Sequence, residues 1–238
     1  MKKAIIIGAS SGIGKELAKI LSRRGWSLGL TARRTELLEK LKSELPGPAL
    51  VKFMDVAKPE TAIPIFQELA QEMGGLDLAI INAGTGFLNP ELEWSKEQAT
   101  IAVNVSGFAA LAGSAMQYFI RQKSGHLVGI SSIAELRGSD ICPAYNASKA
   151  FVSNYLEGLR KKAAKAKLEI TVTDIRPGLV DTAMAQGEGL FWVASPQKAA
   201  EQIYRAIRQK KSRAYVTKRW GLVAGLLQIM PDFLYNKI

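Results

Sequence analysis

Hydrophobic runs alternate with amphipathic stretches along the whole chain, and this alternation predicts the secondary structure. Short aliphatic runs such as KAIIIG near the start are typical of buried strands. Stretches with apolar residues three and four positions apart predict helices, and Gly25 closes the first of them. The predicted strands are 3–8, 27–32, 49–55, 76–84, 125–132, 168–178 and 213–217. The predicted helices are 13–24, 35–45, 58–73, 96–121, 144–165 and 197–209.

Strands that alternate with helices indicate crossover connections and a parallel sheet covered on both faces. The length of 238 residues suits one domain, and the sequence has no repeat, low-complexity tract or linker. We therefore predict a single doubly wound α/β domain of the Rossmann type over 1–238. Its parallel sheet has about seven strands, and 218–238 forms a basic and apolar tail. Ligands of such folds bind at the carboxyl ends of the strands.

Composition and charge restrict the cellular compartment and the kinds of partner that the protein can have. No apolar run reaches the length of about 18 residues that a spanning helix needs. The apolar run after Lys3 is too short for a signal peptide, and the single cysteine fits a reducing cytoplasm. The net charge is +11, from 32 basic and 21 acidic residues. Apart from a basic run at 160–167, read as the solvated end of a helix, these charges are spread out, and no nucleic-acid motif accompanies them.

The stretch GASSGIG at 8–14 follows the first predicted strand directly and leads into the first helix. Glycines permit a tight turn and let a diphosphate approach the backbone, while the helix N-terminus offers unpaired N–H groups. The spacing is G-x-x-x-G-x-G, not the general G-x-G-x-x-G. An ordinary strand-to-helix turn is the alternative. The predicted cofactor contacts here are Gly8, Ser10, Ser11, Gly12, Ile13 and Gly14.

The end of the second predicted strand distinguishes NADP(H) from NAD(H). An NAD site usually has a carboxylate there, roughly 20 residues beyond the glycines, which bonds the ribose 2′-hydroxyl. Here Ala32 offers no carboxylate, and Arg33 and Arg34 follow. Because a guanidinium attracts a 2′-phosphate, the pair favours NADP(H) as cofactor, with NAD(H) as the alternative. Both arginines could instead be solvated.

The stretch YNASK places Tyr145 four residues before Lys149, on one face of a predicted helix. An ammonium beside a phenol lowers the phenol's pKa from about 10, which would give a proton donor and acceptor near neutral pH. Ser132 ends a predicted strand, where its hydroxyl could hold a carbonyl oxygen. Asn104 could hold a water that relays protons to the lysine. A chance pair on an exposed helix is the alternative.

These motifs, with others in the same order, closely resemble the short-chain dehydrogenase/reductase family. The motifs are GASSGIG, Asp55 before Val56, NAG at 82–84, Asn104, Ser132, YNASK and RPGLVDT at 176–182. The resemblance spans about 3–217. Each motif is weak alone, but seven in order at compatible spacings are highly specific.

The resemblance implies a role for each matching residue. Asn104, Ser132, Tyr145 and Lys149 correspond to the catalytic tetrad, and Lys149 would also bind the nicotinamide ribose. Asp55 corresponds to the carboxylate that binds the adenine amino group. The remaining implied cofactor contacts are Val56, Asn82, Ala83, Gly84, Tyr145, Lys149, Pro177, Gly178, Val180 and Thr182. Relatives of this kind are commonly homodimers or homotetramers that pair the two long helices.

Other residues are assigned structural or pocket-lining roles. His126 is interpreted as structural, Cys142 as an apolar filler near the pocket, and Ser131 as pointing away from the site. One histidine and one cysteine leave no zinc site of usual composition. A lipophilic carbonyl or alcohol is the expected substrate, because the candidate pocket residues are apolar. They are Phe87, Ile133, Leu136, Ile141, Met184, Leu190, Phe191 and Trp192.

The tail at 218–238 combines a basic start, aromatic residues and a short apolar stretch. It could lie in a membrane interface, cap the pocket or pack on another subunit. The sequence therefore predicts an NADP(H)-dependent oxidoreductase of a small carbonyl or alcohol substrate. The alternatives are a non-catalytic dinucleotide sensor, a membrane-peripheral binding protein, or an NAD-dependent alcohol dehydrogenase.

Overall fold

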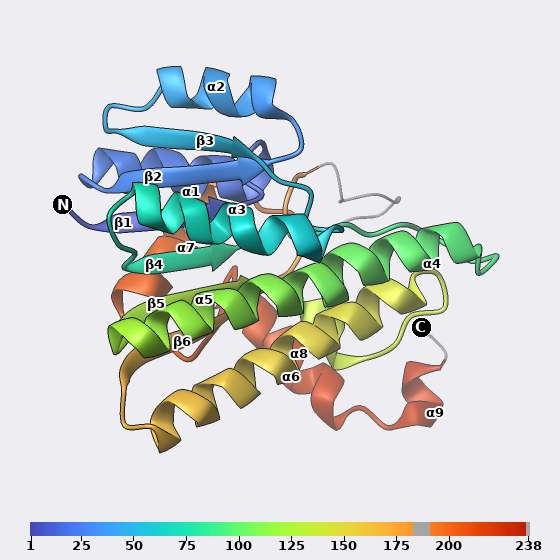
Figure 1. The fold of residues 1–238 in the computed structure, drawn as a ribbon. Coiled ribbons are helices and arrows are strands. Elements are labelled where there is room, and N and C mark those ends of the chain that lie inside the picture. Colours follow the sequence, from blue (N-terminus) through green and yellow to red (C-terminus); the bar gives the residue numbers. More distant parts are fainter. Residues whose placement is uncertain (183–190, 237–238) are drawn as a thin grey trace.

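The structure is a computed structural model that describes residues 1–182 and 191–236, and within these ranges seven parallel strands form one sheet (Figure 1). The spatial order is β3-β2-β1-β4-β5-β6-β7. The strands are β1 (Lys3–Ile7), β2 (Ser27–Ala32), β3 (Ala49–Phe53), β4 (Leu78–Ile81), β5 (Ser124–Ile130), β6 (Glu169–Pro177) and β7 (Arg213–Val216). The predicted Rossmann-type architecture is confirmed.

Helices cover both faces of this sheet (Figure 1). One layer contains α1 (Gly12–Arg23), α2 (Thr35–Ser43) and α7 (Pro196–Arg208). The other contains α3 (Pro59–Glu72), α5 (Phe108–Gln122) and α6 (Pro143–Lys165). The remaining elements are α4 (Trp94–Ile101), η1 (Ala102–Gly107), η2 (Ile133–Leu136), α8 (Trp220–Ile229) and α9 (Asp232–Tyr235).

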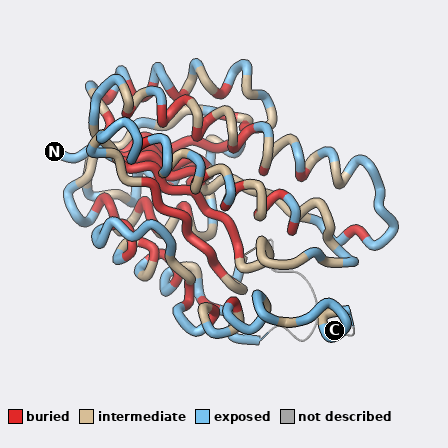
Figure 2. The backbone as a smooth tube through the Cα atoms, turned by 90° about the horizontal axis from the view of Figure 1, so that it is seen from below, coloured by how far each residue is buried: buried red, intermediate tan, exposed pale blue. Residues whose placement is uncertain are grey.

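Alternation along the strands divides the core into two layers. Ala4 and Ile6 of β1 pack towards α1 and α7, whereas Ile5 and Ile7 pack towards α3 and α5. All four side chains are fully buried, and Figure 2 shows the central strands as the most continuously buried part of the backbone. Because both faces are covered, the strands are nearly continuous hydrophobic runs, as parallel sheets require.

The long helix predicted at 96–121 is not one regular α-helix. It begins at Trp94 as α4, widens into the π-helical η1, and continues as α5. At the end of η1, a Cβ on Gly107 would collide with the carbonyl oxygen of Val56. The close approach to the chain after β3 therefore depends on a glycine there. π-Helical turns often occur at functional sites, and this one contains Asn104.

The same stretch qualifies the expectation that no segment could span a membrane. By length and composition, the continuous helical run Trp94–Gln122 is long and apolar enough, with a mean hydropathy of 1.4 in its 18-residue window. Half of that window is buried inside the domain. Since α5 packs against the sheet and contributes Phe108 and Phe119 to the core, we interpret the run as a core helix.

The sheet order creates a crevice at the carboxyl edge. From β1 the chain moves outward to β2 and β3, then returns to place β4 on the other side of β1. The loops after β1 and β4 therefore diverge to opposite faces, which is where ligands bind in open α/β sheets. Gly8 follows β1 and Asn82 follows β4.

Candidate dinucleotide-binding and active site

A cavity of about 660 Å³ opens at this edge, within the size range of cofactor and ligand sites. Loops after six strands and the first turns of α6 form its walls. The predicted cofactor residues that line it are Gly8, Ser10, Ser11, Gly12, Ile13, Arg33, Arg34, Asp55, Val56, Asn82, Ala83, Gly84, Tyr145, Lys149, Pro177, Gly178, Val180 and Thr182. Ser132 also lines it, whereas Gly14 and Asn104 lie behind its wall.

The glycine-rich turn fits a diphosphate because its glycines leave no side chain in the way. Gly8 has φ +88°, and a Cβ there would lie 2.7 Å from the backbone of Ala83. A Cβ on Gly14 would collide with the carbonyl oxygen of Gly8, which also accepts a 2.7 Å hydrogen bond from Asn82 Nδ2. The turn is thereby fixed against the β4 loop, and α1 begins at Gly12 with its first N–H groups beside the cavity.

The two arginines after β2 border the same turn. Arg34 donates from Nη2 to the hydroxyls of Ser11 at 3.0 Å and Ser10 at 3.2 Å. Arg33 is exposed and lines the cavity beside it. Asp55 lines the same cavity after the neighbouring strand β3, with one carboxylate oxygen accepting from Ala57 N at 3.1 Å. Positive charge therefore gathers at the β2 end of the cavity, where the sequence offered no carboxylate.

Tyr145 and Lys149 lie one helical turn apart at the start of α6, after Pro143 at its first position. Lys149 is buried and donates a 3.1 Å hydrogen bond to the carbonyl oxygen of Ile130, the last residue of β5. Its Nζ lies 5.6 Å from the centre of the Tyr145 ring. Burial lowers the pKa of Lys149 to about 8, and the carboxylate of Asp174 opposes this shift. The lysine is therefore a base that titrates close to neutral pH.

The sequence predicted that Lys149 lowers the pKa of the Tyr145 phenol. This prediction is wrong, because the groups of the protein raise that pKa. Burial raises the pKa of Tyr145, and the neighbouring Ser132 hydroxyl acts in the opposite direction. Burial is the physical reason, and Lys149 does not offset it, because its ammonium is bonded to the Ile130 carbonyl and lies 5.6 Å from the centre of the ring. Tyr145 is thus protonated at neutral pH, in the state that donates a proton.

The two serines after β5 point in opposite directions, as the sequence predicted. The backbone of Ser132 is extended, and its Oγ accepts from Ala134 N at 3.1 Å, which caps η2. The same hydroxyl lies 3.4 Å from the carbonyl oxygen of Pro177, at the cavity wall. Ser131 instead donates a 2.5 Å hydrogen bond to Asp174 on β6. Ser131 also borders the cavity, but its hydroxyl is bonded to Asp174, so Ser132 carries the hydroxyl that a ligand can reach.

Asn104 acts through the loop after β4. Its Oδ1 accepts from Thr85 N at 2.9 Å, and its Nδ2 donates to Thr85 O at 2.7 Å and to Ser148 Oγ at 2.9 Å. A Cβ on Gly84 would lie 3.4 Å from both Asn104 Oδ1 and Lys149 Nζ, so these two atoms flank the same glycine. Sequence reasoning missed Thr85 and Ser148, because no local motif marks a residue whose role is to bond a distant amide.

Part of the expected apolar pocket lies at the cavity. Phe87, Ile133, Ile141 and Cys142 line it, but Leu136 does not. Leu88 also lines it and was not predicted. Phe191 and Trp192 are exposed and pack with Trp220, their ring centres 5.3 Å and 6.0 Å from its ring. Met184 and Leu190 lie outside the described residues.

The tail is partly integrated into the domain. Trp220 of α8 is buried directly beneath Gly178, where a Cβ would collide with its ring. Arg137 forms a 2.6 Å ion pair with Asp232 and donates to Met230 O at 2.9 Å. Tyr235 donates to Gly138 O at 2.6 Å. The tail therefore supports the end of β6 and the loop after η2.

The structural interpretation of His126 agrees with its surroundings. It is buried at the start of β5, with Nε2 2.8 Å from Thr173 Oγ1. The Thr173 hydroxyl donates its hydrogen to Lys211 O at 2.5 Å, so Nε2 carries the hydrogen of the His126–Thr173 bond. Among the described residues, no group of three or more histidine, cysteine, aspartate or glutamate side chains could hold a metal ion.

Comparison with known proteins supplies the family. The family model described as short chain dehydrogenase matches residues 2–190. An uncharacterized oxidoreductase of Mycobacterium tuberculosis is 33% identical over 247 aligned positions, which cover 99% of this chain and 96% of the relative. The chain belongs to the short-chain dehydrogenase/reductase family of oxidoreductases.

Solved structures agree on the fold. A short-chain dehydrogenase/reductase from Burkholderia phymatum in complex with NAD has a TM-score of 0.84 at 20% identity, covering 94% of this chain and 92% of that chain. A short-chain dehydrogenase from Sphingobium yanoikuyae in complex with NADPH has a TM-score of 0.80 at 23% identity, covering 98% and 97%. Since one holds NAD and the other NADPH, the fold itself does not select between the two cofactors.

Proposed function

We propose that this protein uses NADP(H) to interconvert a carbonyl and an alcohol on a lipophilic small molecule. The observation that carries the proposal is that one cavity contains the glycine-rich turn, two arginines, Ser132, Tyr145 and Lys149. The cofactor, when bound, supplies or accepts the hydride. The glycine-rich turn and the start of α1 would hold its diphosphate, and Lys149 would bond its nicotinamide ribose.

In the reducing direction, side chains of the protein transfer the proton to the substrate oxygen. Ser132 Oγ donates to the carbonyl oxygen and orients it. Tyr145 then transfers its phenolic proton to that oxygen as the carbon accepts the hydride, so that the carbonyl becomes a neutral alcohol. Lys149 supplies a proton to the phenolate, and Asn104 holds the Gly84–Thr85 loop against the lysine. Solvent returns the proton, and oxidation reverses these steps.

The preference for NADP(H) rests on Arg33 and Arg34. The exposed Arg33 can approach a 2′-phosphate, while Arg34 is oriented by its bonds to Ser10 and Ser11. We expect Arg33→Ala to weaken NADPH binding about tenfold or more and NADH binding less than twofold, as measured by fluorescence titration of both cofactors. Arg23→Ala, on the opposite end of α1, is the matched control. Equal losses for both cofactors would contradict the phosphate contact.

The central test replaces the phenol. Tyr145→Phe removes one oxygen and leaves the ring against Gly86. We expect turnover of a carbonyl panel with NADPH to fall by about 10²–10⁴-fold, while the dissociation constant for NADPH stays within about twofold. A variant that keeps wild-type turnover would overturn the mechanism. A wild-type protein that binds NADPH but turns over no substrate would favour a dinucleotide sensor instead.

The lipophilic character of the substrate rests on Phe87, Leu88, Ile133 and Ile141 along the cavity wall. These side chains desolvate an apolar substrate and leave Ser132 and Tyr145 as its polar contacts. Longer aliphatic ketones should therefore have lower KM values than acetone, and Ile141→Ser should reduce that difference. If chain length has no effect on KM, the apolar wall does not bind the substrate.

We infer a homodimer or homotetramer that pairs the long helices α5 and α6. Partly exposed aromatic residues on α6 support this, since Phe151 and Tyr155 stack at 5.5 Å on its surface. Analytical ultracentrifugation should give an assembly that Phe151→Ser weakens. A wild-type monomer at micromolar concentration would contradict it. The single free cysteine supports a cytoplasmic protein.

We also infer that the tail contacts an anionic membrane surface from the cytoplasmic side. Leu222, Leu226 and Ile229 are exposed at spacings of four and three residues, which form an apolar face on α8, and Phe233 of α9 is exposed as well. The exposed Lys218 and Arg219 precede this face and suit anionic headgroups.

Vesicle sedimentation tests this contact. Leu222→Ser/Leu226→Ser/Ile229→Ser should abolish binding to phosphatidylglycerol vesicles, and Phe53→Ser, on exposed β3, should not. Trp220 is retained in both variants because it packs beneath Gly178. Equal binding by all variants would overturn the contact, as would a triple variant that changes only the oligomeric state.

A further inference from the structure

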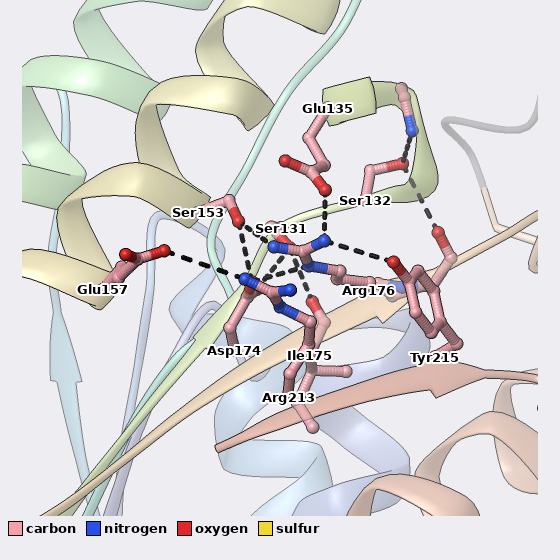
Figure 3. Close-up of polar contacts among 12 residues, drawn as sticks. Ser131, Ser132, Glu135, Ser153, Glu157, Asp174, Ile175, Arg176, Arg213 and Tyr215 are labelled. Carbon is pink, nitrogen blue, oxygen red and sulfur yellow. Dashed lines mark hydrogen bonds and ion pairs between the residues drawn. The ribbon is translucent and has the colours of Figure 1, made fainter. Parts of the chain in front are cut away.

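A buried cluster of charges lies behind the candidate active site, with no part in the proton transfer proposed above. Asp174 and Arg176 are alternate residues of β6, 1% and 3% exposed, and form a 2.7 Å ion pair. Arg176 also pairs with Glu135 of η2 and donates to Tyr215 Oη at 3.2 Å (Figure 3). Burying such charges is costly, and removing one partner leaves the other uncompensated.

Asp174 connects the segments that carry the proposed catalytic groups (Figure 3). Its Oδ1 accepts a 2.5 Å hydrogen bond from Ser131, which lies between Ile130, the acceptor for Lys149, and Ser132. Its Oδ2 accepts at 2.8 Å from Ser153, one helical turn after Lys149 on α6. One carboxylate thus bonds the chain next to Ser132 and the helix next to Lys149.

Lys149 is a further buried cation whose pKa Asp174 affects. Asp174 and Glu135 are carboxylates, and Arg176 and Lys149 are the buried cations that accompany them. Arginine stays protonated in proteins, whereas a buried lysine can lose its proton. Loss of the Asp174 carboxylate would therefore lower the pKa of Lys149 further, because Asp174 is the group that opposes the effect of burial on this lysine.

We propose that Asp174 is a positioning residue that keeps Lys149 protonated and fixes Ser132 and Lys149 relative to each other. The inference rests on the proposed catalytic role of Lys149. Asp174 is the carboxylate that supports the ammonium through the low-dielectric interior, while Glu135 neutralises Arg176 from the other side. Titratable groups on the elements around Lys149 include Tyr145, Cys142, Glu135, Asp174 and Arg176, and Arg160 further along α6 also interacts with Asp174.

The test compares two substitutions that each remove one negative charge from the same arginine. For wild type, Asp174→Asn and Glu135→Gln, kcat for NADPH-dependent carbonyl reduction is measured from pH 6 to 10. Asp174→Asn should move the pH above which kcat falls to a lower value by at least about one unit, while Glu135→Gln leaves it unchanged. KM for NADPH should stay within about threefold in both.

A double variant guards against misfolding. Asp174→Asn leaves Arg176 with Glu135 as its remaining carboxylate, so Asp174→Asn/Arg176→Met, which removes both members of the ion pair, should fold and show the same displacement. An unmoved profile in either folded Asp174 variant overturns the proposal, as does an equal displacement in Glu135→Gln. If Tyr145→Phe is inactive while the Asp174 profiles are unmoved, only this inference fails. If Tyr145→Phe is active, the proposed function fails.

Discussion

His126 and Lys149 are two buried bases at opposite ends of β5, and the charged groups around them differ. Burial lowers the pKa of both, to about 4 for His126 and about 8 for Lys149. Consecutive residues of β6 serve them on opposite faces of the sheet, since Thr173 bonds His126 and Asp174 supports Lys149. Burial and the charge of Lys210 keep the histidine uncharged, whereas the carboxylate of Asp174 helps the lysine keep its proton. The first base is suited to structure and the second to proton transfer.

The largest contrast is expected in turnover. Lys149→Met removes the ammonium and should reduce kcat for carbonyl reduction by about 10²–10⁴-fold. His126→Gln keeps an N–H that can bond Thr173 and should change kcat less than twofold. Steady-state kinetics with NADPH measure both. A loss of comparable size in the two variants would remove the functional distinction between the ends of β5.

A second contrast concerns stability in acid. The folded pKa of His126, about 4, lies below its ordinary value of 6.5, so its contribution is complete above pH 6.5 and is lost as the pH falls towards 4. The difference corresponds to about 3 kcal/mol. Urea unfolding at pH 7.5 and pH 4.5 should show a smaller loss of unfolding free energy in His126→Gln than in wild type. Identical losses would mean that another group controls the acid sensitivity.

The smallest contrast lies in the pH dependence of the reaction. Lys149 has a folded pKa of about 8, below its ordinary 10.5, and in the proposed mechanism it must be protonated to resupply Tyr145. We expect kcat for reduction to be level near pH 7 and to fall about tenfold per pH unit above pH 8. His126→Gln should have the same profile. A kcat that stays level to pH 9.5 would exclude Lys149 as the titrating group.

Much of the fold could be predicted from the sequence, because the periodicity of apolar residues is a local property. All seven strands occur where the pattern places them, although the segment 76–84 contains a strand only from Leu78 to Ile81. The π-helical turn at Asn104 was not predictable from periodicity, since it arises where Gly107 approaches Val56 in space. The two tail helices were not predicted, because burial of Trp220 depends on Gly178, far away in sequence.

The residues of the candidate site likewise include some that the sequence could predict and some that it could not. Gly8, Tyr145 and the arginines after β2 follow from motifs in which neighbours in sequence are neighbours in space. The cluster around Asp174 does not, because its partners come from the turn after β5, from η2, α6 and β7. The direction of the Tyr145 pKa was also predicted wrongly, since charge spacing on a helix carries no information about burial.

The position of Trp220 beneath Gly178 has a practical consequence for anyone preparing this protein. A shortened form that stops before α8 would expose the underside of the chain segment that leads from β6 to Val180 and Thr182. Such a form would lose dinucleotide affinity even though every motif of the family remained in its sequence. Affinity tags therefore belong at the amino terminus, where Met1 is exposed and precedes β1, whose opposite end borders the cavity.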